Sequence, residues 1–303
     1  MYNKFYGFEE YPFSMTPNSR FFFESSKHAE ALSTLLYAIE QRKGFVVITG
    51  DIGSGKTMVC RTLLNQLDSQ TETALITNTY ISGKDLLCSI MDDLYVEYTP
   101  GSKTRLLAQL NNYLIDQIRN DKNVVLIIDE AQNLKPSVLE EIRMLSNLET
   151  ENEKLLQIIF LGQPELKQKL SLARLEQLRQ RIAVFYHLSP LGEEEAKKYI
   201  QHRIEVASSQ PGKEIFTPEA LGLVYEFSRG IPRLINQICD SALLSGYVYG
   251  KPVIGAAIMR EVIDESPMSQ LSSSRKKAVQ KIDDLERKKF ENPMMDINIP
   301  DRI

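Results

Sequence analysis

Short apolar runs alternate along the first two thirds of the chain with longer stretches in which apolar residues recur every three or four positions. The five apolar runs are residues 45–49, 74–77, 124–128, 155–161 and 182–188. Runs of this length, with helical stretches between most of them, predict a parallel β-sheet covered by helices on both faces. The pattern therefore predicts an α/β fold.

Helical periodicity flanks this region on both sides. A first helix is predicted over residues 27–41, where apolar residues recur at helical spacing and Gly44 follows the end. After Pro190 no further strand pattern occurs. Instead, Thr217 before Pro218 predicts a helix N-cap, and the apolar face within residues 234–243 predicts a long helix. The second part of the chain is therefore predicted to be helical.

These changes of pattern divide the chain into four segments. Residues 1–44 hold three aromatic clusters, which predict an extended segment packed on the domain, and then the first helix. Residues 45–190 form the α/β domain, and residues 191–265 form the helical one. Residues 266–303 are rich in Ser, Lys, Arg and Asp and are expected to form a polar, mobile tail.

Composition narrows the class of protein. With 43% hydrophobic and 25% charged residues, the chain is typical of a globular protein. Its three cysteines are widely spaced and form no CxxC pair, which argues against a disulfide framework and a zinc site and favours a reducing compartment. Neither a membrane-spanning apolar run nor an export signal is present, so we expect a cytoplasmic protein with no direct membrane span.

The strongest chemical signal is GDIGSGKT, which directly follows the first apolar run and opens a helix. It satisfies the P-loop pattern GxxxxGK[S/T], in which backbone N–H groups surround a phosphate. Lys56 would reach the β- and γ-phosphates and the Thr57 hydroxyl would bind Mg²⁺, so we predict ATP and Mg²⁺ as cofactors. The nucleotide-binding residues predicted here are Gly50, Asp51, Ile52, Gly53, Ser54, Gly55, Lys56, Thr57 and Met58.

Two adjacent carboxylates, Asp129 and Glu130, end the third apolar run. Ligands of parallel sheets bind at this carboxyl edge, and successive side chains of a strand point in opposite directions. We therefore predict that Asp129 holds Mg²⁺ or its water beside the nucleotide, and that Glu130 polarises the attacking water.

A neutral polar residue, Gln163, ends the fourth apolar run in the sequence IIFLGQPEL. Its amide could orient the lytic water at the same edge of the sheet. The alternative is that the amide only caps the helix that follows.

Taken in order, GDIGSGKT, DEAQNL, LSNLETENEKLLQIIFLGQPEL, LRQRI and GIPRLIN closely resemble the ExeA/GspA-type AAA+ ATPases of general secretion. The opening YGFEEYPFSMTPNSRFFF is also similar to theirs, so the resemblance spans residues 1–265. It implies an AAA+ fold: a P-loop domain with a parallel five-stranded sheet in the order 5-1-4-3-2, followed by a small α-helical lid domain.

The resemblance also implies roles for three arginines. In LRQRI, Arg181 or Arg179 resembles the arginine finger that a neighbouring subunit inserts toward the γ-phosphate. In GIPRLIN, Arg233 resembles the sensor-2 arginine, which contacts the nucleotide and couples the lid to its state. A guanidinium suits both roles because it is always charged and binds phosphate oxygens in a fork. Each of these arginines could instead form an ordinary surface ion pair.

Three functions fit these residues. The resemblance favours an oligomeric ATPase, a ring or filament, that drives assembly of a secretion, pilus or exopolysaccharide apparatus with membrane-associated partners at the inner face of the membrane. The second is an ATP-dependent DNA-binding regulator of transposition that acts with a transposase. Assembly would then gather basic residues such as Lys84, Lys103 and Arg105, since a net charge of −4 gives no overall cationic field. The third, a P-loop kinase, is disfavoured because Glu130 suits activation of water.

The remaining polar groups are interpreted as structural. His28, His187 and His202 lack metal-ligand spacing, so they are assigned to packing and hydrogen bonding. The basic residues of the tail, at 275–277 and 287–289, alternate with acidic ones and indicate a solvated helix.

Overall fold

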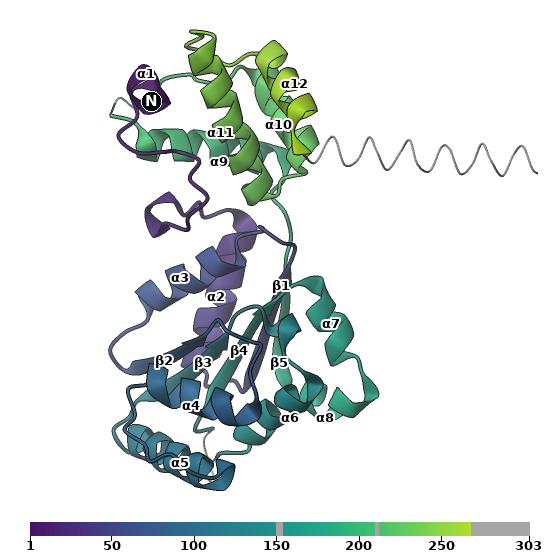
Figure 1. Cartoon of the computed structure of the whole chain (residues 1–303). Coiled ribbons are helices and arrows are strands. Elements are labelled where there is room, and N and C mark those ends of the chain that lie inside the picture. The colour runs from purple at the N-terminus through teal and green to yellow at the C-terminus, as the bar shows by residue number, and fades with distance from the viewer. Residues whose placement is uncertain (150–153, 210–211, 268–303) are drawn as a thin grey trace, which may run out of the picture.

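A five-stranded parallel sheet forms the centre of the larger part of the molecule, as the computed structural model of the chain shows for residues 1–149, 154–209 and 212–267 (Figure 1). The strands are β1 (Phe45–Gly50), β2 (Thr71–Ile76), β3 (Asn123–Ile128), β4 (Gln157–Gly162) and β5 (Ile182–Leu188). Their order is β2-β3-β4-β1-β5. This is the predicted order 5-1-4-3-2 read from the opposite edge, so the predicted sheet is confirmed.

Helices cover both faces of this sheet. They are α2 (Ser26–Glu40), α3 (Lys56–Gln66), α4 (Gly83–Asp93), α5 (Lys103–Arg119), α6 (Pro136–Leu145), α7 (Pro164–Leu170) and α8 (Glu176–Gln180). Alternate residues of β1 belong to different cores: Val47 packs with the apolar residues of α4, α5 and α6, whereas Val46 packs with those of α2 and α3. A strand buried on both faces must be apolar throughout, which is why the central strands read as continuous apolar runs.

The second part of the chain is helical within the residues described, as predicted. It contains α9 (Glu193–Ala207), α10 (Pro218–Ser228), α11 (Pro232–Val248) and α12 (Ala256–Glu265), which share a separate apolar core. We call these four helices the helical unit. The side chain of Thr217 accepts a hydrogen bond from the Ala220 N–H, so the predicted N-cap is confirmed.

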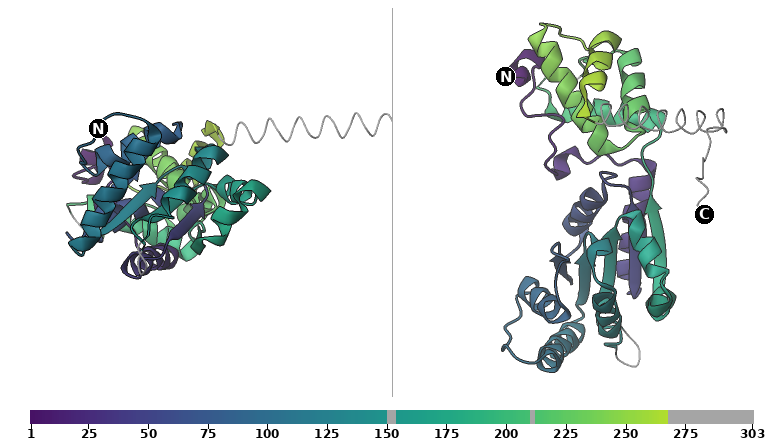
Figure 2. Two further views of the ribbon diagram at one scale, coloured as in Figure 1. Left: turned by 90° about the horizontal axis from the view of Figure 1, so that it is seen from below. Right: turned by 45° about the vertical axis from the view of Figure 1, so that its right-hand side comes forward.

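The N-terminal segment, residues 1–25, packs mainly on the helical unit (Figure 2), while Phe22 packs against the core between the sheet, α2 and α3. It is not extended throughout, because Tyr2–Tyr6 form the short helix α1 and Ser19–Phe21 a 3₁₀ turn. Its aromatic side chains at Tyr2, Tyr6, Phe8, Phe13 and Phe21 are buried in the core of the helical unit. The segment therefore crosses from the helical unit to α2 and the sheet.

Two predictions concern membranes and the tail. Within the described residues, no helix is long and apolar enough to cross a membrane. The predicted tail lies outside the described residues from position 268 onward.

Candidate nucleotide-binding and active site

The P-loop joins the end of β1 to the start of α3 and is tightly packed. Gly53 and Gly55 have φ of 81° and 103°, a backbone conformation that favours glycine. A Cβ on Gly53 would collide with the side chain of Arg233, and a Cβ on Gly55 would lie 2.6 Å from Nε2 of His28. The two glycines therefore permit both the bend of the loop and its close packing against other elements.

Lys56 begins α3 and is 5% exposed. Its Nζ donates to the backbone oxygens of Gly50, at 2.8 Å, and Asp51, at 2.9 Å. Burial lowers the pKa of Lys56, and the nearby carboxylates of Glu130 and Asp129 only partly offset this effect. No ion pair to Lys56 is present among the described residues, so a phosphate group would supply the counter-charge that the ammonium lacks.

Thr57, in the first turn of α3, lies beside Asp129, which directly follows β3. The Thr57 hydroxyl donates to Oδ2 of Asp129 at 3.1 Å, and Oδ1 accepts from the Glu130 N–H at 2.9 Å. Burial raises the pKa of Asp129, against the effect of these hydrogen bonds and of Lys56. Mg²⁺ binds oxygen ligands, and in phosphate sites a hydroxyl and a carboxylate supply them, so these two residues fit the predicted ion.

Glu130 is held by two amides. Its backbone is in the left-handed region with φ of 52°, which is rare for a non-glycine residue. Oε2 accepts from Nε2 of Gln132 at 2.5 Å and from Nε2 of Gln163 at 3.0 Å. Gln132 was not singled out by its sequence, although its place two residues after the carboxylate pair was a usable signal.

The contact with Glu130 bears on the two interpretations of Gln163. Gln163 occupies the N-cap position of α7, but its side chain makes no cap hydrogen bond. The amide instead reaches the carboxylate predicted to polarise water. Its exact role in orienting that water stays a prediction.

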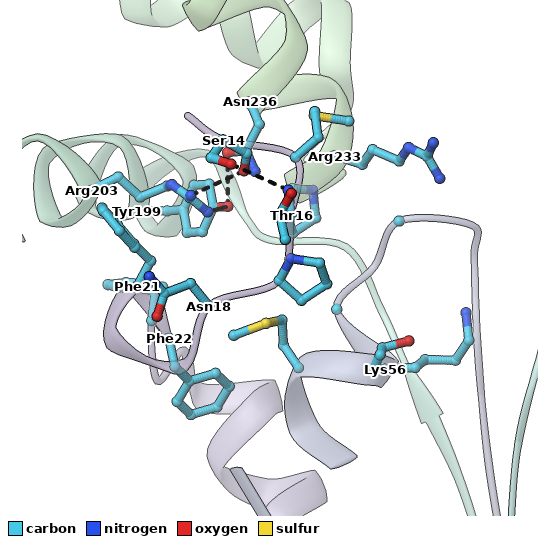
Figure 3. Close-up of a pocket in the computed structure, with 18 of the residues that line it drawn as sticks. Ser14, Thr16, Asn18, Phe21, Phe22, Lys56, Tyr199, Arg203, Arg233 and Asn236 are labelled. Carbon is cyan, nitrogen blue, oxygen red and sulfur yellow. Dashed lines mark hydrogen bonds between the residues drawn. The ribbon is translucent and has the colours of Figure 1, made fainter. Parts of the chain in front are cut away.

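A cavity of about 390 Å³ lies beside the P-loop, a size typical of small-molecule sites (Figure 3). Most of its lining comes from three parts of the chain: the N-terminal segment between Ser14 and Phe23, the P-loop with Met58, and the helical unit. His28 and Glu130 line it as well. Of this lining, the sequence predicted the P-loop with Met58, Glu130 and, on the helical unit, Arg233. With its phosphates at the P-loop, a nucleotide would have its base and ribose in the space between the N-terminal segment and the helical unit.

Polar side chains on the helical unit form one connected chain along this cavity (Figure 3). Arg203 Nη1 donates to the Tyr199 hydroxyl at 2.9 Å, and that hydroxyl donates to Oδ1 of Asn236 at 2.9 Å. The Arg203 guanidinium also donates to the carbonyls of Pro12 and Ser14. These bonds hold the N-terminal segment against the cavity.

Arg233 lies at the start of α11, directly against the P-loop. Its N–H donates to the Gly53 carbonyl at 3.3 Å, and its side chain lines the cavity. The fold therefore brings the predicted sensor-2 residue and the P-loop together. The guanidinium forms no ion pair with any described residue.

Arg179 and Arg181 are not brought to this site. β5 runs parallel to β1, with Ile182 paired to Phe45 and Leu188 to Gly50. Arg181 is therefore beside the start of β1, whereas the P-loop follows its end, about 17 Å away for five residue steps. Arg181 donates to the Ser146 hydroxyl at 2.7 Å, and Arg179 is exposed. Both lie away from the P-loop of their own chain, so a finger role for either stays a prediction about a second subunit, beside the alternative of an ordinary surface contact.

His28 has an unexpected place. It was assigned to packing and hydrogen bonding without a place at the site, and its Nε2 lies 3.1 Å from the Ser54 carbonyl oxygen in the P-loop. The other two histidines lie elsewhere: His187 Nδ1 is 3.1 Å from the Thr49 hydroxyl, and the His202 ring lies 5.7 Å from the ring of Phe23.

Comparison with known proteins agrees with this geometry. An AAA domain family matches residues 39–170. General secretion pathway protein A of Aeromonas hydrophila is 44% identical over 252 residues, which are 82% of this chain. The chain spans 46% of the length of that relative.

Solved structures share the fold at low sequence identity. The ORC2 protein of Aeropyrum pernix superposes with a TM-score of 0.65 at 15% identity and covers 86% of this chain and 72% of its own. Cdc6p of Pyrobaculum aerophilum gives 0.63 at 17%, covering 80% and 67%. The RuvB branch migration motor of Thermotoga maritima gives 0.54 at 17%, covering 80% and 69%. The P-loop, the sheet order and the AAA domain together identify the chain as an AAA+ ATPase that is similar in sequence to general secretion pathway protein A.

Proposed function

We propose that the chain hydrolyses ATP in a Mg²⁺-dependent reaction and works as an oligomeric motor or switch in the assembly of a secretion, pilus or exopolysaccharide apparatus. The observation that carries the chemistry is the convergence of Lys56, Thr57, Asp129 and Glu130 at the carboxyl edge of β1 and β3. The similarity to general secretion pathway protein A supports the process.

In this reaction Lys56 leaves the carbonyls of Gly50 and Asp51 and binds the β- and γ-phosphates. Thr57 and Asp129 would hold Mg²⁺, which supplies positive charge at the phosphate oxygens when it is bound. Glu130 accepts a hydrogen bond from the attacking water and polarises it. Gln132 and Gln163 keep one carboxylate oxygen of Glu130 fixed, so the other oxygen can face the water.

The separation of the arginines from the P-loop supports the proposed assembly. An arginine that cannot reach its own P-loop acts only if another subunit presents it. Such a contact joins two different surfaces, so it closes into a ring or continues as a filament. We place the protein in the cytoplasm, at the inner face of the membrane through partner proteins.

Two measurements test the proposal. Phosphate release from ATP should be abolished by EDTA and restored by Mg²⁺. In the host, deletion of the gene should lower the amount of exported protein, and the wild-type gene, but not its Glu130→Gln form, should restore it. Unchanged export after deletion would contradict the assigned process and leave the ATPase chemistry standing.

A role on DNA is the second candidate, because Lys84 and Arg105 are exposed near the starts of α4 and α5 and form no ion pair among the described residues. Lys103 supports it less, since its ammonium is 2.7 Å from Glu141. Fluorescence anisotropy of labelled duplex DNA with ATP tests this candidate. Binding that falls when Lys84 and Arg105 are changed to Ala would favour the regulator of transposition.

A further inference from the structure

His28 contacts the P-loop from the side of α2 and also lines the cavity beside it. The residue lies in the first turn of α2 and is 5% exposed. Nε2 is 3.1 Å from the Ser54 carbonyl oxygen, and Nδ1 is 2.7 Å from the hydroxyl of Ser25, the N-cap of α2. The absent Cβ of Gly55 is what lets the imidazole approach this closely.

The partners of His28 determine where its ring proton sits. A carbonyl oxygen only accepts hydrogen bonds, so Nε2 carries the proton and donates it to Ser54. Nδ1 is then unprotonated and accepts from the Ser25 hydroxyl, whose oxygen in turn accepts from the His28 N–H at 3.3 Å. Burial lowers the pKa of His28, against the smaller effects of the Ser54 carbonyl and Glu195, and this favours the same neutral ring.

The bond to Ser54 fixes a peptide group of the P-loop. In a planar trans peptide the C=O and the N–H of the next residue point in opposite directions. With the Ser54 carbonyl directed at His28, the Gly55 N–H is directed away from α2 and toward the inside of the loop. No described residue accepts a hydrogen bond from this N–H, so it is available to a phosphate oxygen.

We propose that His28 is a positioning residue, which holds the Ser54–Gly55 peptide so that the Gly55 N–H faces the phosphates of the bound nucleotide. A peptide that is already oriented binds phosphate without first being ordered, so its loss weakens binding. The proposal rests on the nucleotide site of the ATPase and does not depend on the process that the protein serves.

The start of α2 is itself held by the helical unit. Oε1 of Glu195 accepts from the Ser26 N–H at 2.9 Å and the Ser26 hydroxyl at 2.8 Å, and Oε2 accepts from the Gly192 N–H at 3.3 Å. Burial raises the pKa of Glu195, but these hydrogen bonds outweigh it and the net pKa is lowered. The carboxylate thus stays charged between the starts of α2 and α9 and keeps His28 in register with the loop.

Two variants of His28 separate the hydrogen bond from packing. His28→Leu keeps much of the side-chain volume but has no donor, whereas His28→Gln keeps a donor near the position of Nε2. The readout is the Kd of a fluorescent ATP analogue, with inorganic tripolyphosphate as a competitor that reports on the phosphate cradle alone. We expect His28→Leu to weaken both ligands about tenfold, the scale of one lost hydrogen bond, and His28→Gln to recover most of that loss.

His202→Ala is the matched control, because it also removes a histidine ring packed against the aromatic N-terminal segment but lies away from the P-loop. It should leave both affinities near wild type. Equal weakening in His202→Ala, wild-type affinity in His28→Leu, or a Gln variant as weak as the Leu variant at the same Tm would each overturn the role of His28. Retained affinity in Lys56→Ala would instead show that the P-loop site itself is misassigned.

Discussion

Glu130 combines a left-handed backbone with a carboxylate that is held by two hydrogen bonds. A left-handed backbone at a non-glycine residue costs roughly 1–3 kcal/mol, and such residues cluster at functional sites. Here the conformation turns the carboxylate toward Gln132 and Gln163, which both donate to the same oxygen. The second oxygen is then the one that remains for water.

Glu130→Gln should bind ATP with nearly unchanged affinity and lose turnover. Thr57 and Asp129 are untouched in this variant, whereas the amide that replaces the carboxylate is a poor base. We expect kcat to fall by about a hundredfold or more, the usual contribution of a general base. Steady-state phosphate release and a nucleotide-binding titration measure the two effects. More than about a tenth of the wild-type rate would mean that another group activates the water.

Gln163→Ala tests whether the amide matters beyond its place at the start of α7. Loss of a hydrogen bond to a charged group should lower kcat about tenfold or more while the Kd for ATP stays near wild type. The control is Gln180→Ala, an exposed glutamine at the end of α8. If both variants keep the wild-type kcat, the contact with Glu130 has no catalytic role.

Among the elements, four strands were predicted to within two residues of their bounds, the edge strand β5 included, whereas the edge strand β2 was predicted less closely. β1 was predicted at 45–49 and is Phe45–Gly50. β2 was predicted at 74–77 but begins at Thr71, because on this edge strand the first three residues are only half-buried and therefore are not apolar. The strand order came from the family resemblance, since apolar runs alone do not say which strands pair.

The turn between α10 and α11 has a conformational requirement that a pair of glycines can test. Gly230 has φ of 77°, and a Cβ there would overlap the carbonyl of Leu191, where the chain enters the helical unit. Gly222 lies inside α10 with open space around it. The first glycine is therefore required by the fold, whereas the second only weakens its helix.

Gly230→Ala should lower the free energy of unfolding by more than about 2 kcal/mol, from backbone strain and the overlap together. Gly222→Ala should raise it by about 0.5–1 kcal/mol, because alanine is a better helix former. Chemical denaturation monitored by circular dichroism measures both. Equal effects of the two substitutions would show that the turn tolerates a side chain.

For the whole molecule, the wall of the cavity contributed by the N-terminal segment and the helical unit was, apart from Arg233, the part that the sequence did not predict. The P-loop and the carboxylate pair are contiguous motifs, so each could be recognised locally. The bond from Arg203 to Pro12 joins residues 191 positions apart and belongs to no motif. Tyr199, Asn236 and His28 were missed for the same reason: their roles arise only when the helical unit, the N-terminal segment and the P-loop meet.

The predicted arginine finger is tested by mixing two inactive variants. Arg181→Ala lacks the finger but keeps its P-loop, and Lys56→Ala should lose nucleotide binding but keep its arginines. In a mixed assembly a Lys56→Ala subunit can present its arginine to the intact P-loop of an Arg181→Ala subunit, so some ATPase activity should return. The rate of the wild type should rise faster than linearly with protein concentration.

Arg179→Ala in the same assay decides between the two arginines, since Arg181 is bonded to Ser146 whereas Arg179 is exposed. If Arg179→Ala is inactive by itself and recovers activity when mixed with Lys56→Ala, whereas Arg181→Ala does not behave in this way, the finger is Arg179. A strictly linear concentration dependence, no larger species in light scattering with ATP and no recovery with either arginine variant would rule out catalysis shared between subunits.

The opposite placement of the P-loop and these arginines along β1 and β5 gives any such assembly a direction. Every subunit must face the same way, so an open assembly of n subunits has n − 1 complete sites and one terminal P-loop without an arginine. A closed ring has n complete sites and no such end. The activity per subunit should therefore approach its limit gradually as filaments lengthen, but reach it in one step when a ring closes, so kinetics can distinguish the two forms.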